Sequence, residues 1–172
     1  MARCWRRLGK NAETLKLIFA IIAGGYVLFQ YHSNVSDEKI KKTLEFQSRY
    51  GKDDVGKARI ELKNYWLLDP DRKKRIEEDA AKSKVQPGLR IAQAVLKEKE
   101  LARSVWILAD FFEQVTTCVR GGLCDQDTAC ASFKSDVIAV RNTYYHLFKL
   151  WKAAWGEDLI EKSYDFFYNN CK

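Results

Sequence analysis

Residues that break helices, and motifs that hold nucleotides, are scarce in this sequence. Its 172 residues include two prolines and nine glycines, and no segment alternates apolar and polar residues as a half-buried strand would. Gly121-Gly122 lacks the lysine and the serine or threonine of a phosphate loop, and no serine-hydrolase elbow is present. These absences predict an all-α protein, and they favour a protein without enzymatic activity.

Metal ligands are also few. The chain has two histidines, and Cys118, Cys124 and Cys130 follow one another at intervals of six residues, whereas zinc sites favour close cysteine pairs separated by two to four residues. We therefore expect no metal, no cofactor and no catalytic residue. A cysteine nucleophile would need His146 at the same end of a helix pair as Cys118, and nothing in the sequence places it there. A membrane-anchored enzyme with an unrecognised site is the alternative.

An apolar segment near the N-terminus is the most informative feature that is present. Residues 17–29 carry no charge, and five basic residues precede them, namely Arg3, Arg6, Arg7, Lys10 and Lys16. With its edges the stretch is about 17 residues long, the low end of what crosses a bilayer core of roughly 30 Å. The sequence predicts a basic tail over 1–14, a transmembrane signal-anchor helix over 15–32 and a helical domain over 33–172.

Two alternatives to this anchor stay open, a cleaved signal peptide and a buried helix of a soluble regulatory protein. Residues 28–32 contain none of the small residues that signal cleavage requires, and no polar residue interrupts 17–29 as it would in an amphipathic helix. Five basic residues within the first sixteen, against five spread over positions 39–52, favour a single-pass protein whose domain lies outside the cytoplasm over one with a cytoplasmic domain.

The formal charge of +7 is distributed unevenly along the chain. Residues 1–32 hold five basic residues and one acidic residue, and the remainder holds 25 basic and 22 acidic residues. This near balance argues against a nucleic-acid surface on the domain. The expected partners are the lipid bilayer and either a protein partner or a second copy of the chain, with no nucleic acid.

Capping residues predict the helices that follow the apolar segment. Ser36 precedes two acids and Gly51 follows the apolar pattern, so a helix is expected over 37–50. A second helix is expected over 54–67, and its predicted buried residues are Ile60, Tyr65, Leu67 and Leu68.

Later segments predict three further features. A highly charged, mostly solvated helix is expected over 71–84, and residues 85–88 form the clearest break inside the domain. A final helix is expected over 157–168, with the packing candidates Leu159, Ile160, Tyr164, Phe167 and Tyr168.

Two heptad stretches predict the centre of the domain. One buries Leu101, Val105, Leu108, Phe112, Val115 and Val119; the other buries Phe133, Val137, Val140, Tyr144, Leu147, Trp151 and Ala154. Gly121-Gly122 and a capping Asp125 or Asp127 between them indicate a hairpin, in which facing residue numbers sum to about 248. The predicted fold is an N-terminal transmembrane helix followed by an antiparallel helical bundle centred on this long helical hairpin.

Cysteine usage suggests disulfide bonds. The domain holds four cysteines, an even number that is consistent with an oxidising compartment. The hairpin register places Cys118 opposite Cys130, so these two are the first candidates for a bridge. Cys124 and Cys171 form a possible second pair, although the predicted last helix is too short to reach the hairpin tip. Cys4 is expected to remain reduced, and four reduced thiols in a cytosolic bundle are the alternative.

The layout also resembles a known group of proteins. The segment Leu108-Ala109-Asp110-Phe111-Phe112-Glu113-Gln114-Val115, which leads through Val119-Arg120-Gly121-Gly122-Leu123-Cys124-Asp125 into a long aromatic-rich helix, is similar to a bacterial family of uncharacterised single-span membrane-anchored helical proteins. The resemblance covers about residues 12–155. It implies no catalytic residue and no ligand, and the cysteines at the turn depart from the family pattern.

Overall fold

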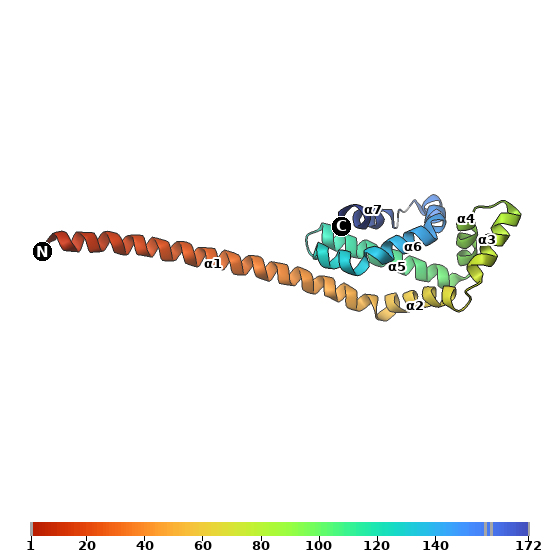
Figure 1. Ribbon diagram of the computed structural model, residues 1–172, viewed down its shortest axis with the longest axis horizontal. Coiled ribbons are helices and arrows are strands. Elements are labelled where there is room, and N and C mark those ends of the chain that lie inside the picture. The colour runs from red at the N-terminus through yellow and green to blue at the C-terminus, as the bar shows by residue number, and fades with distance from the viewer. Residues whose placement is uncertain (1, 157, 159, 172) are drawn as a thin grey trace. The chain divides into compact units, whose positions relative to one another are not determined.

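The computed structural model describes the backbone of residues 2–156, 158 and 160–171, and their side chains other than those of 2–18, 20 and 32 (Figure 1). Over this part of the chain the fold is all-α, as predicted, with seven helices and no strand. The helices are α1 (Ala2–Tyr50), α2 (Asp53–Leu67), α3 (Arg72–Ser83), α4 (Pro87–Lys97), α5 (Lys99–Arg120), α6 (Gln126–Trp155) and α7 (Glu161–Asn170).

The chain divides into two compact units, Met1–Glu38 and Lys39–Lys172. Helix α1 continues through Ser36, so the predicted helix start at that residue is wrong. No glycine or proline lies between Gly25 and Gly51, and a single serine does not interrupt a helix. The predicted end before Gly51 is confirmed, because α1 ends at Tyr50.

The transmembrane helix predicted over 15–32 is not supported by the structure. Among the described residues, none of the helices combines the length and the apolar character that crossing a membrane requires. The side chains of residues 15–18, 20 and 32, which belong to this segment, lie outside the described residues, as does that of Cys4.

Helix α5 occupies the centre of the second unit, where it contacts α2, α4, α6 and α7. All six of its predicted heptad residues are buried, and so are Phe133, Val137, Tyr144, Leu147 and Trp151 of α6. Val140 is half-buried, whereas Ala154 is exposed. Phe111, which the heptad pattern omits, is also buried and stacks on Tyr50 at the end of α1, with ring centroids 5.4 Å apart.

The turn between α5 and α6 is built as its residues predict. Gly122 adopts a left-handed conformation with φ of 69°, and the Asp125 carboxylate accepts a hydrogen bond of 2.8 Å from the backbone nitrogen of Thr128. The two hydrogen bonds from Thr128 lower the pKa of Asp125. The backbone nitrogen of Asp125 donates to the hydroxyl of the buried Thr43, which fastens the end of α1 to this turn.

Helix α6 contains a kink at Tyr144, where φ is −107° and ψ is 18°. No proline or glycine occurs within α6, so tertiary contacts hold the kink. The Tyr144 hydroxyl is buried and accepts a hydrogen bond of 2.8 Å from Trp66 Nε1 on α2. Burial raises the pKa of Tyr144 to about 12.

Of the four residues predicted to be buried in and just after α2, three are exposed, so the prediction is wrong for them. Ile60, Leu67 and Leu68 are 57%, 62% and 83% exposed, and Tyr65 is half-buried. The residues that face the core are instead Val55, Gly56, Ala58 and Leu62. Leu62 follows Val55 by seven residues and shares its face, whereas Ile60 and Leu67 lie more than 100° around the helix from it. The helix therefore presents a largely small-residue face to α5 and leaves larger apolar side chains outside.

Helix α7 begins at Glu161, four residues later than predicted. Ile160 and Phe167 are buried and Tyr164 is half-buried, but Tyr168 is exposed, contrary to the prediction. Leu159 lies outside the described residues. Phe166, which the sequence did not single out, is buried beneath the Arg120 guanidinium.

The predicted bridge between Cys118 and Cys130 is wrong, and so is the possible second pair of Cys124 and Cys171. Cys118 is joined to Cys124, and Cys130 is joined to Cys171, with Cα atoms 5.3 and 5.4 Å apart. The contacts near the tip depart from the predicted pairing. The Phe133 ring lies 5.6 Å from that of Phe111, which is four residues before its predicted partner Val115.

The kink in α6 explains why Cys171 reaches the hairpin tip. Beyond the kink α6 ends at Gly156, whose φ of 75° is left-handed, and the chain returns so that Glu161, at the start of α7, forms an ion pair with Arg141 (Nη2 to Oε2, 3.2 Å). From there α7 runs beside the first half of α6, and Lys134 Nζ donates to the carbonyl oxygen of Cys171. The eleven residues from Glu161 to Cys171 thus span the same stretch as the twelve from Cys130 to Arg141.

The two bridges should differ in their contribution to stability. Replacing Cys130 and Cys171 together by serine should lower the free energy of unfolding by about 4 kcal/mol, because this bridge joins residues 41 positions apart. Replacing Cys118 and Cys124, which are six positions apart, should lower it by about 2 kcal/mol. Urea unfolding of the full-length protein in one detergent measures both, and each variant controls for the other. A larger loss from the Cys118–Cys124 variant would contradict this assignment.

Candidate interaction surface on helices α2, α3 and α4

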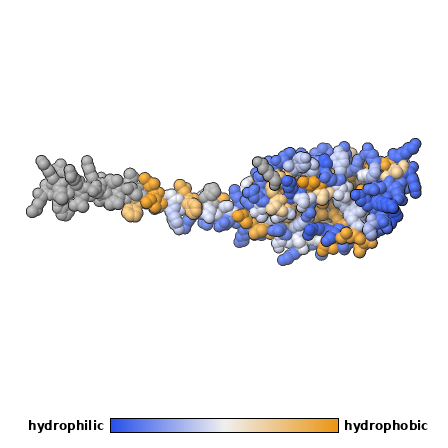
Figure 2. Space-filling view, in the orientation of Figure 1, coloured by the Kyte–Doolittle hydropathy of each residue, from blue (hydrophilic) through white to orange (hydrophobic). Residues whose placement is uncertain are grey.

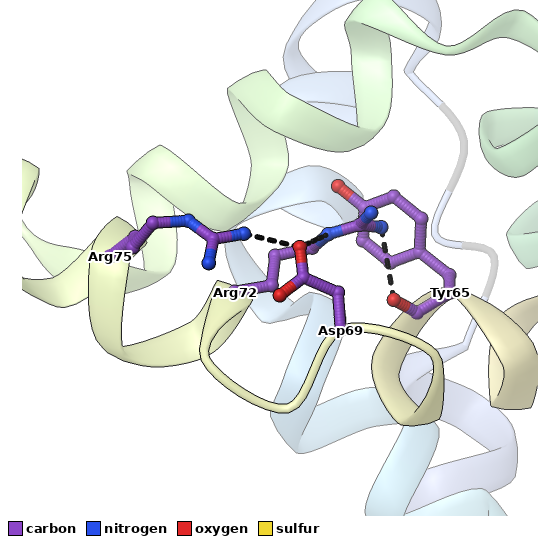
Figure 3. Close-up of polar contacts among 4 residues, drawn as sticks. All are labelled: Tyr65, Asp69, Arg72 and Arg75. Carbon is purple, nitrogen blue, oxygen red and sulfur yellow. Dashed lines mark hydrogen bonds and ion pairs between the residues drawn. The ribbon is translucent and has the colours of Figure 1, made fainter.

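The turn between α2 and α3 is held by one carboxylate and two guanidinium groups (Figure 3). Asp69 Oδ2 accepts a hydrogen bond of 3.3 Å from Arg72 Nε, and it also accepts one from Arg75 Nη2. The hydrogen bond from Arg75 is the main cause that lowers the pKa of Asp69. Two arginines therefore share a single acidic oxygen, which leaves the cluster with an excess positive charge.

Arg72 is held in place more firmly than an exposed arginine. Its Nη1 donates a hydrogen bond of 2.9 Å to the backbone oxygen of Tyr65, and its guanidinium carbon lies 3.8 Å from the centroid of the Tyr65 ring. Figure 3 shows the guanidinium lying across this ring, between Tyr65 and Asp69. The stacking and the two hydrogen bonds fix the direction of the side chain before any ligand arrives.

A cavity of about 300 Å³ opens between α3 and α4 beside this cluster. Four cationic side chains line it, two from α3 and two from α4, and they are Arg72, Arg75, Arg90 and Lys97. Asp79 and Glu98 are the acidic residues of its wall. The charged helix that the sequence predicts to be mostly solvated therefore supplies half of a cationic cavity, although its outer residues are exposed as expected.

Arg90 contributes a guanidinium group to this cavity. Its Nη1 donates to Gln93 Oε1 at 3.2 Å. Its Nε lies 3.4 Å from Asp79 Oδ2, close enough for an ion pair, but it makes no hydrogen bond within the described residues although it is buried. The Asp79 side chain is 66% exposed, so water screens this pair.

A groove of about 600 Å³ runs along α2 next to the cavity. Ile60, Leu68 and Leu101 supply its apolar wall, and Tyr65 and Arg72 line both the groove and the cavity. Figure 2 shows apolar surface at the lower edge of this unit, in the region of α2. The exposed apolar residues of α2 thus border the cationic cavity and form one continuous surface with it.

The position of α4 depends on a close contact with α6. At Gly88, in the first turn of α4, a Cβ atom would lie 3.0 Å from His146 Nε2 and still closer to its Cδ2. Only glycine lets the backbone of α4 approach the imidazole ring this closely. His146 thereby sets where Arg90 and Lys97 stand.

The structure does not bring together the residues that were considered for a cysteine nucleophile or a metal site. Cys118 is in a disulfide near the hairpin tip, whereas His146 packs against α4 beyond the kink. Arg141 bonds Glu161 and lies between the rings of Tyr145 and Tyr164. Within the residues that the structure describes, no three histidine, cysteine, aspartate or glutamate side chains are grouped to hold a metal ion.

Three tryptophans form a separate aromatic cluster on α5 and α6. The Trp106 ring meets those of Trp151 and Trp155 edge to face, with centroids 5.5 Å apart in both cases. Trp151 is buried, and Trp155 is 59% exposed. The cluster therefore anchors the second half of α6 on α5 and leaves one ring at the surface.

The contact between Gly88 and His146 can be tested by a double-mutant cycle. Gly88→Ala should lower the free energy of unfolding by about 1–3 kcal/mol, because the added methyl group overlaps the imidazole, even though alanine favours helix formation. In a His146→Ala background the same change should be close to neutral. Urea unfolding of the four proteins gives the coupling energy, and an equal loss in both backgrounds would show that the contact does not position α4.

Comparison with known proteins gives no relative from which to transfer a role to this surface. No family model matches the chain, and neither the search of curated proteins nor the search of solved structures gave a significant match.

Proposed function

We propose that this protein is a membrane-attached helical interaction module that holds a disulfide-stabilised domain outside the cytoplasm and acts by binding rather than by catalysis. The observation that carries the proposal is the pattern of exposed apolar side chains. Large apolar residues project from two places, the N-terminal part of α1 and the outer face of α2, and these define a membrane contact and a partner contact. The proposal includes the resemblance of the sequence to bacterial membrane-anchored helical proteins.

The first contact is the apolar segment of α1. Eight large apolar or aromatic side chains between Phe19 and Tyr31 are each between 61% and 72% exposed. Exposing this many apolar groups to water in one segment is unfavourable, since each would gain about 1.5–3 kcal/mol on full burial. Lipid is the environment that removes this penalty, and the basic residues before the segment favour anionic head groups.

The two disulfide bonds support the location of the domain. Cys118–Cys124 and Cys130–Cys171 together use all four cysteines of residues 33–172. Disulfides persist in oxidising compartments and are rare where glutathione keeps thiols reduced. This agrees with the charge distribution around the apolar segment, which favours a domain outside the cytoplasm.

The second contact is the face of α2 with Ile60, Leu67 and Leu68. The fold buries small residues of this helix and exposes these three, although burying them would be worth more. Patches of this kind, rimmed by polar residues, mark interaction sites in soluble domains. Lys57, Glu61 and Asn64 form the polar rim, which favours a partner protein that covers the groove.

Membrane attachment is tested by placing charges in the apolar segment. Changing Ile21 and Ile22 together to lysine should release the protein from membranes or cause its degradation, because each charge costs about 2.5–3.5 kcal/mol at the centre of a membrane helix. The matched control changes Gln47 and Ser48 of the same helix, both exposed, to lysine. Fractionation with a carbonate wash measures attachment. Equal retention of both variants in the membrane pellet would exclude attachment through this segment.

The partner contact is tested by photocrosslinking in native membranes. A photoreactive residue at Leu68, which follows the last residue of α2 and is 83% exposed, should give a discrete crosslinked species, whereas the same residue at Lys82 of α3 should not. Two differently tagged copies of the chain reveal whether the adduct is a second copy. The absence of any adduct specific to position 68 would argue against a partner on this face.

A further inference from the structure

We propose that the cavity between α3 and α4 is a binding site for a phosphate group. Arg72, Arg75, Arg90 and Lys97 converge on a space of about 300 Å³, the lower end of the size range of small-ligand sites. This inference goes beyond the proposed function and does not depend on membrane attachment. Its ligand is recognised through phosphate oxygens, whether these belong to a free phosphorylated compound or to a phospholipid head group.

The donor atoms of the cavity are arranged for an oxyanion. Arg72 uses Nε for Asp69 and Nη1 for the Tyr65 carbonyl, and it makes no hydrogen bond through Nη2 within the described residues. Arg75 uses only Nη2, and Lys97 has no hydrogen-bond or ion-pair partner there. Guanidinium groups present paired donors that match phosphate oxygens, so these atoms suit such a ligand.

Arg90 adds a third guanidinium, which comes from α4. Its Nη1 donates to Gln93, and its Nε is buried 3.4 Å from Asp79. Its Nη2 makes no hydrogen bond within the described residues, so this atom can donate to an oxygen of a ligand in the cavity.

The charges at the start of α3 also favour a bound anion. Its first turn, Arg72-Lys73-Lys74-Arg75, contains four cations and no acid, although the helix dipole disfavours cations at this end. Asp69 binds two of the arginines through one oxygen, so it orients them without neutralising both. Of these four residues Arg72 and Arg75 line the cavity, and an anion there would offset their charge, a dianion such as phosphate more than a carboxylate.

The test is a titration of the full-length protein, in a maltoside detergent that contains no phosphate, with inorganic phosphate by calorimetry. Saturable binding is expected, and Arg75→Gln and Arg90→Gln should each weaken it by about tenfold or more, because each removes a charge-assisted hydrogen bond. Lys73→Gln is the matched control, since it removes a charge from the same helical turn at an exposed position outside the cavity wall. It should change the affinity by less than about twofold.

Circular dichroism and thermal unfolding check that all variants fold. Absence of saturable phosphate binding to the wild-type protein would overturn the proposal. An equal loss from Lys73→Gln and Arg90→Gln would overturn it as well, because the attraction would then be a general effect of positive charge.

A second arm distinguishes the two sources of phosphate. The titration is repeated in micelles of the same detergent that contain phosphatidic acid. If a lipid head group is the ligand, phosphatidic acid should occupy the cavity and abolish the calorimetric signal from inorganic phosphate in the wild-type protein. If a free compound is the ligand, the titration should be unchanged. Either result supports a phosphate site, and comparing the two titrations shows whether the phosphate group belongs to a lipid or to a free compound.

Discussion

The contact between Trp66 of α2 and the kink at Tyr144 of α6 is the constraint on which most of the domain depends. A straight α6 would carry its last eleven residues away from α5, and α7 would then begin too far from the hairpin tip to return to it. The kink, followed by the left-handed turn at Gly156, instead lets the chain return to Arg141. Because α6 has no helix-breaking residue of its own, the hydrogen bond from Trp66 and the packing of His146 against Gly88 hold the bend.

The Cys130–Cys171 bridge and the position of the cavity both follow from that bend. α7 returns along the first half of α6, which brings Cys171 beside Cys130. On the other side, the segment after the kink supplies His146, on which α4 rests, and α4 carries Arg90 and Lys97 to the cavity. One local distortion therefore determines a covalent link at one end of the domain and the geometry of the proposed phosphate site at the other.

The proposed surface combines exposed large apolar side chains with a cluster of cationic side chains, and both are unfavourable in an isolated domain. Ile60, Leu67 and Leu68 leave apolar area in water, and the arginines of α3 concentrate positive charge where the helix dipole opposes it. Both features reduce the stability of the isolated domain. A partner on the groove and an anion in the cavity would offset these losses, which is the physical basis for assigning binding to this surface.

Sequence alone determined the features that depend on local pattern. The all-α class, the helices of the hairpin, the turn at Gly122 with its cap at Asp125, and the heptad residues of α5 follow from a period of three to four residues and from capping chemistry, which need no knowledge of distant contacts. Tertiary structure decided what depends on several helices at once. These features include the face that α2 buries and the pairing of Cys118 with Cys124 instead of Cys130. They also include the kink in α6 that precedes the return of Cys171 to Cys130, and the four cations that α3 and α4 bring to one cavity. A near-neutral domain charge concealed that cluster, because charge counted along the chain does not reveal which side chains the fold brings together.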